Sequence, residues 1–374
     1  MRDDLASIPK LGFGCMRLPL TDPADVTSVD IPQLTQMVDE FLAAGNTYFD
    51  TAFSYHDGAS ETALQQALTS RYPRDAYTVA TKCPAAMLPN RESAQACLAT
   101  SLERLGLTYI DFYLLHNLGG PRTAAFDDYG MWDYVLRKKE EGLIRNVGFS
   151  LHDNADALDA LLTAHPQMDF VQLQVNYLDW DDPHNDARRL MEVAAAHETP
   201  VVIMEPARGG TLCRLPDATV APLRALRPDA SLAEWAYRFC WDLPNVVTML
   251  SGMSTLDQVR ENTASYRARV PLADEERAAL GRTVEAMRSL ALVPCTGCEY
   301  CVKGCPANVA IPRIMQLLNL GAMLGDDAFA KTQYAWQTEG RRASSCIGCG
   351  ACEAACPQAI PIIDTLAVAA GKFE

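Results

Sequence analysis

The sequence lacks the features that would send the chain across a membrane or bind it to a polyanion. Met1 to Lys10 contain no apolar segment of the kind found in a signal peptide. No run of about 18 apolar residues is present, so we expect no membrane-spanning helix. Positive charge is scarce, because 32 Lys and Arg residues stand against 47 Asp and Glu residues and the net charge is −15. Such a chain repels nucleic acid, and we expect a cytoplasmic protein that acts on a small molecule.

A glycine-rich phosphate loop after an early strand is also absent, which argues against an open doubly wound sheet. The run Gly12-Phe13-Gly14 is too short and precedes no helix. Strand-like apolar runs instead alternate with helical patterns from Leu11 to about Val270, which predicts parallel strands and crossover helices. Roughly eight such units favour a closed (β/α)8 TIM barrel. The expected strands lie near residues 11–15, 47–50, 77–82, 110–116, 146–150, 171–175, 201–204 and 246–250.

A second domain follows the barrel. A final helical pattern over 273–292 leaves the barrel, and Pro294 ends it just before a cysteine-rich segment. The expected division therefore falls at about residue 290, with the barrel over 1–290 and the second domain over 291–374. Apolar residues at helical spacing predict that the second domain is mostly helical. The expected helices cover 312–324 and 362–370.

Eight of the 13 cysteines form two arrays with the same spacing, C-x2-C-x2-C-x3-C-P. In this spacing, three thiolates of one tight loop ligate one cubane cluster, and the fourth thiolate ligates the other cluster. The sequence therefore predicts two [4Fe–4S] clusters. The expected ligands are Cys295, Cys298, Cys301 and Cys356 for one cluster, and Cys346, Cys349, Cys352 and Cys305 for the other.

A pair of zinc sites is the alternative, since CxxC is also a zinc signature. Zinc would give no role to the third cysteine step or to the following proline, so the spacing favours clusters. A disulfide framework does not suit a chain with the other features of an intracellular enzyme. The arrays resemble those of dicluster ferredoxins, and the helix between them makes the helical type the closer likeness. The remaining cysteines are expected to be buried thiols, namely Cys15, Cys83, Cys97, Cys213 and Cys240.

Four polar residues lie at or just after the carboxyl ends of three consecutive predicted strands, namely Asp50, Tyr55, Lys82 and His116. Barrel chemistry gathers at that face. Taken alone, Asp50 could be a cap, Tyr55 a partly buried anchor and His116 a packing residue. Together they form a proton-transfer set, which is what a carbonyl needs when it receives a hydride.

The chemistry of this set follows from the side chains. A free tyrosine has a pKa of about 10 and holds its proton tightly. We expect the Lys82 ammonium to lower the pKa of the Tyr55 phenol, and the Asp50 carboxylate to keep Lys82 charged and oriented. His116 can donate a hydrogen bond to the carbonyl oxygen and fix its angle.

These segments resemble the catalytic tetrad of the aldo/keto reductases, complete and in order. They read Phe49-Asp50-Thr51-Ala52-x-x-Tyr55, Ala80-Thr81-Lys82 and Leu114-Leu115-His116-Asn117. The resemblance covers about residues 8–290 and includes the opening run 11–17. It implies that Tyr55 is the general acid, that Lys82 and Asp50 adjust its pKa, and that His116 orients the substrate.

The same resemblance implies a nicotinamide cofactor, either NADP or NAD. Ser150 and Gln172 match the residues that hold the carboxamide. The residues that match the adenosine-binding loop and helix start are Ser254, Gln258, Glu261 and Asn262. Ser254 or Thr255 would cap that helix, whose free amides suit an anion.

The sequence departs from the family pattern at three places in this cofactor site. Leu151 stands where the family usually carries Asn after the carboxamide serine, and Met204 stands where an aromatic side chain stacks on the nicotinamide. No Lys or Arg adjoins Ser254 to bind a 2′-phosphate, which leaves NAD and NADP open. Arg208 and Arg260 are the other candidates for that contact.

The leading hypothesis is an oxidoreductase that reduces a carbonyl, or oxidises an alcohol, with NAD(P)H. A hydride moves two electrons together, whereas a [4Fe–4S] cluster passes one at a time. The clusters are therefore expected to connect the barrel to a redox partner such as a ferredoxin or a flavoprotein, with stabilisation or sensing as other roles. The alternative is a redox-sensing or electron-transfer subunit whose barrel binds nicotinamide without significant turnover. The complete tetrad favours the enzyme.

Overall fold

A computed structural model describes residues 3–182, 185–290, 292–324 and 327–374 of the protein. Internal contacts divide the chain into two compact units. The first unit comprises Met1–Pro206 and Tyr237–Pro271, and the second comprises Ala207–Ala236 and Leu272–Glu374. The predicted domain boundary near residue 290 stays a prediction. Among the described residues, no helix combines the length and apolar character that a membrane crossing requires.

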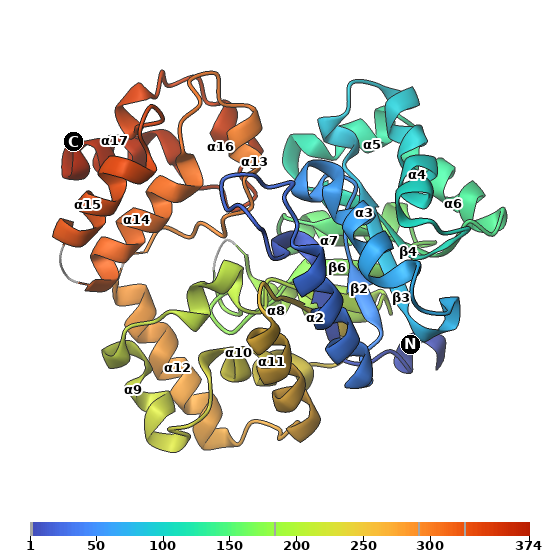
Figure 1. Ribbon diagram of the computed structural model, residues 1–374, viewed down its shortest axis with the longest axis horizontal. Helices are drawn as coiled ribbons and strands as arrows, with labels where there is room; N and C mark the ends of the chain where they lie inside the picture. The colour runs from blue at the N-terminus through green and yellow to red at the C-terminus, as the bar shows by residue number, and fades with distance from the viewer. Residues whose placement is uncertain (1–2, 183–184, 291, 325–326) are drawn as a thin grey trace. The chain divides into compact units, whose positions relative to one another are not determined.

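Eight parallel strands of the first unit close into a barrel in the order β1 to β8. Strands β2, β3, β4 and β6 are labelled in Figure 1. They are β1 (Leu11–Gly14), β2 (Tyr48–Asp50), β3 (Thr78–Cys83), β4 (Ile110–Leu118), β5 (Ile144–Leu151), β6 (Phe170–Gln174), β7 (Val201–Met204) and β8 (Val246–Gly252). The sheet closes because β1 pairs with both β2 and β8. The predicted (β/α)8 TIM barrel is therefore confirmed, and each expected strand is found within two residues of its expected bounds.

The helices of the first unit follow the strands in alternation. They are α1 (Asp3–Ala6), α2 (Ile31–Ala43), α3 (Ala59–Leu64), α4 (Arg91–Leu105), α5 (Ala124–Asp128), α6 (Met131–Glu140), α7 (Ala155–Ala164), α8 (Ala187–Ala196) and α11 (Leu256–Ala268), while α10 (Leu232–Trp241) spans the division between the units. Capping residues in the sequence determine where these helices begin and end. Asn90 caps α4 by accepting the Ser93 N–H, and Gly106 ends it in a left-handed conformation with φ 63°.

Aromatic side chains fill the barrel interior. The ring centroids of Tyr48 and Phe112 lie 5.1 Å apart, and those of Phe112 and Phe170 lie 4.9 Å apart. All three side chains are buried, as is Lys82 on the neighbouring strand. Because the interior is a packed core and not a pore, chemistry is confined to the rim where the strands end.

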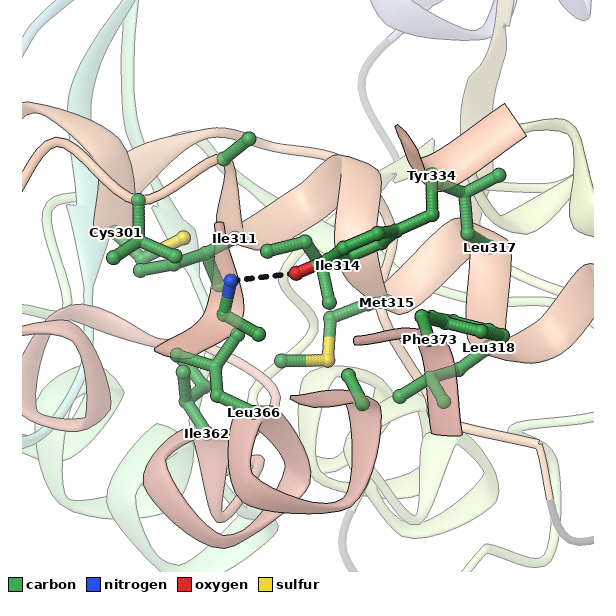
Figure 2. Close-up of a cluster of buried hydrophobic side chains, with 14 of the residues drawn as sticks. Cys301, Ile311, Ile314, Met315, Leu317, Leu318, Tyr334, Ile362, Leu366 and Phe373 are labelled. Carbon is green, nitrogen blue, oxygen red and sulfur yellow. Dashed lines mark hydrogen bonds between the residues drawn. The ribbon is translucent and has the colours of Figure 1, made fainter. Parts of the chain in front are cut away.

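The second unit is helical, which confirms the predicted character of the C-terminal region. Its helices are α9 (Asp217–Leu226), α12 (Asp274–Ser289), α13 (Tyr300–Lys303), α14 (Ile311–Leu324), α15 (Asp327–Gln337), α16 (Ala351–Ala355) and α17 (Ile362–Phe373). Figure 2 shows the apolar side chains gathered between α14, α15 and α17. Tyr334 and Phe373 pack with ring centroids 5.2 Å apart. Helix α15 is not among the helices predicted from the sequence.

Candidate active site and cysteine-lined cavities

The four residues expected at the barrel rim converge. Asp50 ends β2, Lys82 lies in β3, His116 lies in β4, and Tyr55 begins a short turn after β2. The Lys82 ammonium donates to Asp50 Oδ1 at 2.5 Å, to the Thr51 carbonyl at 2.7 Å and to Tyr55 Oη at 3.4 Å. The rings of Tyr55 and His116 meet edge to face with centroids 5.7 Å apart. All three ammonium protons are thus used within the site.

Asp50 and Lys82 form a buried ion pair, with exposures of 2% and 0%. Burial raises the pKa of Asp50, and the Lys82 charge opposes that rise. Burial lowers the pKa of Lys82, and the Asp50 charge opposes that fall. Each charge therefore depends on the other, and loss of either leaves its partner buried and uncompensated.

The expected lowering of the Tyr55 pKa is wrong for the ligand-free protein. Burial of the phenol raises the pKa of Tyr55 well above 10, the carboxylates of Asp50 and Glu205 raise it further, and Arg17 lowers it. The Lys82 ammonium lies 3.4 Å from Tyr55 Oη and is paired with Asp50 at 2.5 Å. Tyr55 is therefore protonated at neutral pH.

His116 is buried, with an exposure of 3%. Burial first, and then the nearby Lys82 and His152, hold the pKa of His116 well below 6.5. The imidazole is therefore neutral at neutral pH. A neutral imidazole can donate an N–H hydrogen bond to a carbonyl oxygen without giving up its proton.

Backbone strain is stored beside the acid. Tyr55 is followed by His56 and Asp57, whose φ values of 52° and 51° lie in the left-handed region. Arg104 of α4 donates to the Phe53 carbonyl at 3.1 Å and so holds the segment that leads into this turn. The position of Tyr55 thus depends on a residue about fifty positions away, which sequence reasoning did not single out.

The two residues expected to hold a carboxamide are brought together. Ser150 and Gln172 are opposite one another in the register of β5 and β6, and both are buried. Ser150 Oγ accepts the Asn117 N–H at 2.7 Å, and Gln172 Nε2 donates to Met204 Sδ at 3.5 Å. Within the described part of the chain, Gln172 Oε1 is buried and has no hydrogen-bond partner. Such a buried acceptor fits a cofactor that brings N–H donors.

The expected adenosine-binding residues gather at the start of α11. Thr255 caps the helix, since its side chain accepts the Gln258 N–H at 3.3 Å. The Ser254 N–H donates to Gln258 Oε1 at 2.7 Å, and Glu261 is exposed. Asn262 is turned inward, with its amide donating to Ser251 Oγ at 3.1 Å.

The two candidates for a 2′-phosphate contact lie in different surroundings. Arg260 pairs with Glu40 at 2.6 Å. Arg208 is buried, with an exposure of 7%, and belongs to the second unit. The choice between NAD and NADP is therefore not decided by these two side chains.

The eight array cysteines surround two cavities in the second unit. The first has a volume of about 340 Å³ and is lined by Cys295, Cys298, Cys301 and Cys356, among others. The second has a volume of about 310 Å³ and is lined by Cys305, Cys346, Cys349 and Cys352, among others. Each cavity thus combines three cysteines of one array with the fourth of the other, as the spacing predicts.

The chemistry of the cysteines suits a cationic cluster. Burial and the neighbouring thiols Cys298, Cys295 and Cys356 all raise the pKa of Cys301. Thiolates crowded in this way need positive charge among them, which iron supplies. Within the described residues, no three His, Cys, Asp or Glu side chains are grouped to hold a single metal ion. The cysteines instead enclose the wider cavities described above.

Polar contacts hold the loops that carry these cysteines. Asn319 of α14 accepts the Val293 N–H at 2.7 Å and donates to the Val293 carbonyl at 2.8 Å, two residues before Cys295. Tyr334 of α15 accepts the Ala343 N–H at 2.7 Å, the contact dashed in Figure 2. Sequence reasoning missed Asn319 and Tyr334, because only their helical spacing was visible.

Glu374 forms two further hydrogen bonds near these loops. Tyr334 Oη donates to Glu374 Oε1 at 2.5 Å, and the same oxygen accepts the Ser344 N–H at 3.1 Å. Ile311, at the start of α14, lines both cavities. The two sites therefore share one helix and one apolar core.

A parallel eight-stranded barrel with a buried lysine, aspartate and histidine and a half-buried tyrosine at its rim, on a chain with two cysteine-lined cavities, defines an oxidoreductase. The model of the aldo/keto reductase family matches residues 10–284. The chain belongs to this family. The model of the 4Fe-4S dicluster domain matches residues 294–360, so the second domain is of that type.

Relatives agree with this assignment. An aldo-keto reductase of Mycolicibacterium vanbaalenii is 31% identical over 59% of this chain and 73% of its own length. An aldo-keto reductase of Mycobacterium avium is 30% identical over 70% of this chain and 81% of its own.

Solved structures give the same fold. The aldo-keto reductase AKR11C1 from Bacillus halodurans, in its holo form, is 27% identical with a TM-score of 0.58, over 73% of this chain and 91% of its own. An aldo-keto reductase from Klebsiella pneumoniae, in complex with NADPH, is 22% identical with a TM-score of 0.58, over 74% of this chain and 90% of its own.

Proposed function

We propose that the barrel reduces a carbonyl, or oxidises the corresponding alcohol, by hydride transfer with NADPH or NADH. The observation that carries this proposal is the buried set in which Lys82 contacts both Asp50 and Tyr55. When bound, the nicotinamide supplies the hydride, which is two electrons and one proton. The carbonyl carbon receives it, and the carbonyl oxygen needs one further proton.

Tyr55 supplies that proton from Oη. Its raised pKa keeps it protonated across the neutral range, so the acid is present when substrate arrives. Once the proton has left, the Lys82 ammonium lies 3.4 Å from the phenolate oxygen, and Asp50 keeps that charge in place. His116 is neutral and donates to the same carbonyl oxygen, which fixes its direction.

We further propose that Ser150 and Gln172 hold the nicotinamide carboxamide, and that Ser254, Gln258, Glu261 and Asn262 contribute to the adenosine end. The carboxamide contacts are supported by Gln172 Oε1, a buried acceptor without a hydrogen-bond partner among the described residues. The gathering of Ser254 and Gln258 at the start of α11 supports the adenosine contacts, because the positive end of the helix dipole suits an anion.

The two cysteine-lined cavities support a proposal of two [4Fe–4S] clusters, with the crossed ligand sets given above. When bound, such clusters pass single electrons. We propose that they connect the barrel to a redox partner such as a ferredoxin or a flavoprotein. A cytoplasmic location and a domain boundary near residue 290 belong to the same proposal.

Two measurements on anaerobically purified protein test these proposals. Iron and acid-labile sulfide analysis should give about eight irons per chain, and stoichiometric zinc with little iron would exclude the clusters. Oxidation of NADPH or NADH with a panel of aldehydes should show steady turnover. Tight cofactor binding without turnover on any aldehyde would instead favour the redox-sensing subunit.

A further inference from the structure

The end of β4 departs from regular strand geometry immediately after His116. The register between β4 and β5 shifts between Leu115 and Leu118, where Leu118 is opposite Leu151. Asn117 lies within this shift and has a φ of 65°, in the left-handed region that asparagine tolerates better than most residues. The irregularity therefore places an asparagine at the rim, beside the end of β5.

Two backbone hydrogen bonds fix Asn117 in this position. Its N–H donates to Ser150 Oγ at 2.7 Å, and its carbonyl accepts from Arg122 Nε at 2.9 Å. The side chain is buried with the rest of the residue, which is 6% exposed. Among the described residues, Asn117 Oδ1 has no hydrogen-bond partner. A buried amide oxygen without a partner calls for a donor that the chain itself does not supply.

Three polar groups at this rim can each form one further hydrogen bond, and together they present a specific set of donors and acceptors. Asn117 Oδ1 and Gln172 Oε1 are both buried acceptors without partners in the described residues. Ser150 Oγ accepts the Asn117 N–H, so its own proton is available to donate. Two acceptors and one donor are the hydrogen-bond complement of a primary carboxamide, which has two N–H groups and one carbonyl oxygen.

We propose that Asn117 is a cofactor-positioning residue whose Oδ1 accepts one N–H of the nicotinamide carboxamide. Gln172 accepts the other N–H, and Ser150 donates to the carbonyl oxygen. Leu151 is apolar at the position after Ser150 where the family usually has Asn, and Asn117 supplies an amide from the adjacent strand instead. This inference rests on the proposed nicotinamide function. Three contacts to one carboxamide fix the rotation of the ring.

The test compares two cofactors that differ only in the carboxamide. NADPH has both N–H donors, whereas its reduced 3-acetylpyridine analogue carries a methyl ketone in place of the amide. Dissociation constants are measured by titration of the holoprotein, without turnover. Asn117→Gly deletes the amide and suits a positive φ. We expect it to weaken NADPH binding about 3- to 10-fold, as for one hydrogen bond, and to leave analogue binding unchanged.

Two further variants serve as controls for Asn117→Gly. Asn117→Asp keeps an acceptor oxygen and tolerates the left-handed backbone, so it should retain the preference for NADPH over the analogue. Asn245→Gly is the matched control, because Asn245 also has a positive φ of 62° but lies before β8 and donates to the Thr199 carbonyl. It should leave both constants unchanged.

The outcomes separate this inference from the function on which it rests. If Asn117→Gly weakens both cofactors equally, or neither, the role given to Asn117 is wrong while hydride transfer stands. If Asn117→Asp loses the preference as fully as Asn117→Gly, an acceptor role for Oδ1 is also wrong. If the parent protein binds neither NADPH nor NADH, the nicotinamide function fails and this inference fails with it. NADH and its analogue serve as the pair if the parent prefers NADH.

Discussion

The barrel site and the cysteine-lined cavities are built in opposite ways. At the barrel rim the chain supplies both charges of the buried pair, and the Lys82 ammonium has all three protons bonded within the site. In the second unit the cysteines enclose cavities of about 340 and 310 Å³, and the thiolate of Cys301 is disfavoured. The protein thus organises the first site itself, whereas the second needs a cation to complete it.

The two sites also differ in which segments of the chain they bring together. The barrel residues come from three consecutive strands, so the closed sheet positions them without a ligand. Each cavity instead joins cysteines from both arrays, for example Cys356 with Cys295. Ligation there would cross-link segments about sixty residues apart, and binding free energy then becomes folding free energy. Changes at the barrel rim should therefore affect chemistry, and changes in the second unit should affect iron retention.

The largest expected effect is on catalysis. Tyr55→Phe keeps the ring and removes the acidic proton, and a positioned general acid contributes about 10²–10⁴ in rate. We expect kcat for aldehyde reduction to fall by that factor, with cofactor binding and iron content nearly unchanged. Stopped-flow oxidation of NADPH and iron analysis check this.

The same substitution in the other region is the matched control. Tyr334→Phe removes a hydroxyl from the second unit and should leave kcat unaffected. A Tyr55→Phe variant that turns over like the parent would mean that another group donates the proton, and the tetrad assignment would be lost.

The next effect is on the stability of the barrel. Lys82→Met leaves Asp50 buried without its partner, and breaking a buried pair in this way costs about 3–5 kcal/mol. Urea unfolding followed by barrel fluorescence should show that loss, together with a fall in kcat. Lys138→Met removes a half-buried surface lysine that pairs with the exposed Glu141 and should cost less than about 1 kcal/mol. Equal losses in the two variants would contradict the proposed dependence of Asp50 on Lys82.

A smaller effect is expected in the second unit. Tyr334→Phe leaves the Ala343 N–H and the Glu374 carboxylate without their shared partner, which costs about 1–3 kcal/mol. Iron should be released to a chelator faster than from the parent, because this contact holds the loop just before Cys346. Tyr72→Phe removes a comparable hydroxyl contact to Asp39 in the barrel unit and should leave the release rate unchanged. Identical release from all three proteins would show that the contact does not restrain the loop.

The smallest effect concerns pH. The Glu205 carboxylate raises the pKa of Tyr55, so Glu205→Gln should lower that pKa. The Arg17 charge already lowers the same pKa and loses its ion pair with Glu205, which acts in the same direction. Alcohol oxidation needs the phenolate as its base, so its rate rises with pH toward the pKa. We expect that rise to move to lower pH by up to about one unit.

The exposed carboxylate of Glu103 gives the control for this shift. Glu103→Gln should leave the pH profile of alcohol oxidation unchanged. A shift toward higher pH in Glu205→Gln would contradict the sign of the Glu205 effect.

The parts of the fold that sequence predicts are those fixed by local patterns. Alternating strand and helix patterns predict the barrel, because parallel strands must have their crossovers on the outside. The strand-end rule then brings Asp50, Lys82 and His116 to one rim. The cysteine spacing predicts the crossed sets around the cavities for a similar reason, since three ligands of each set lie in one short loop.

The parts that sequence misses depend on contacts between distant residues. The raised pKa of Tyr55 depends on burial and on the nearby Asp50 and Glu205 carboxylates, which only geometry reveals. The position of Asn117 depends on the register shift between β4 and β5, which no local sequence pattern predicts. Tyr334 and Glu374 meet across 40 positions of sequence, and nothing in either segment points to the other.

The most direct test of the difference between the two regions follows the hydride itself. NADPH with deuterium at both C4 positions is mixed anaerobically with an aldehyde and the iron-loaded protein in ordinary water, and the alcohol is analysed by mass spectrometry. If the barrel carries out the chemistry by itself, the alcohol carries one deuterium on its carbinol carbon, and chelation of the iron leaves that content unchanged. An alcohol without deuterium would show that the electrons do not reach the carbinol carbon as a hydride from NADPH and would contradict this account.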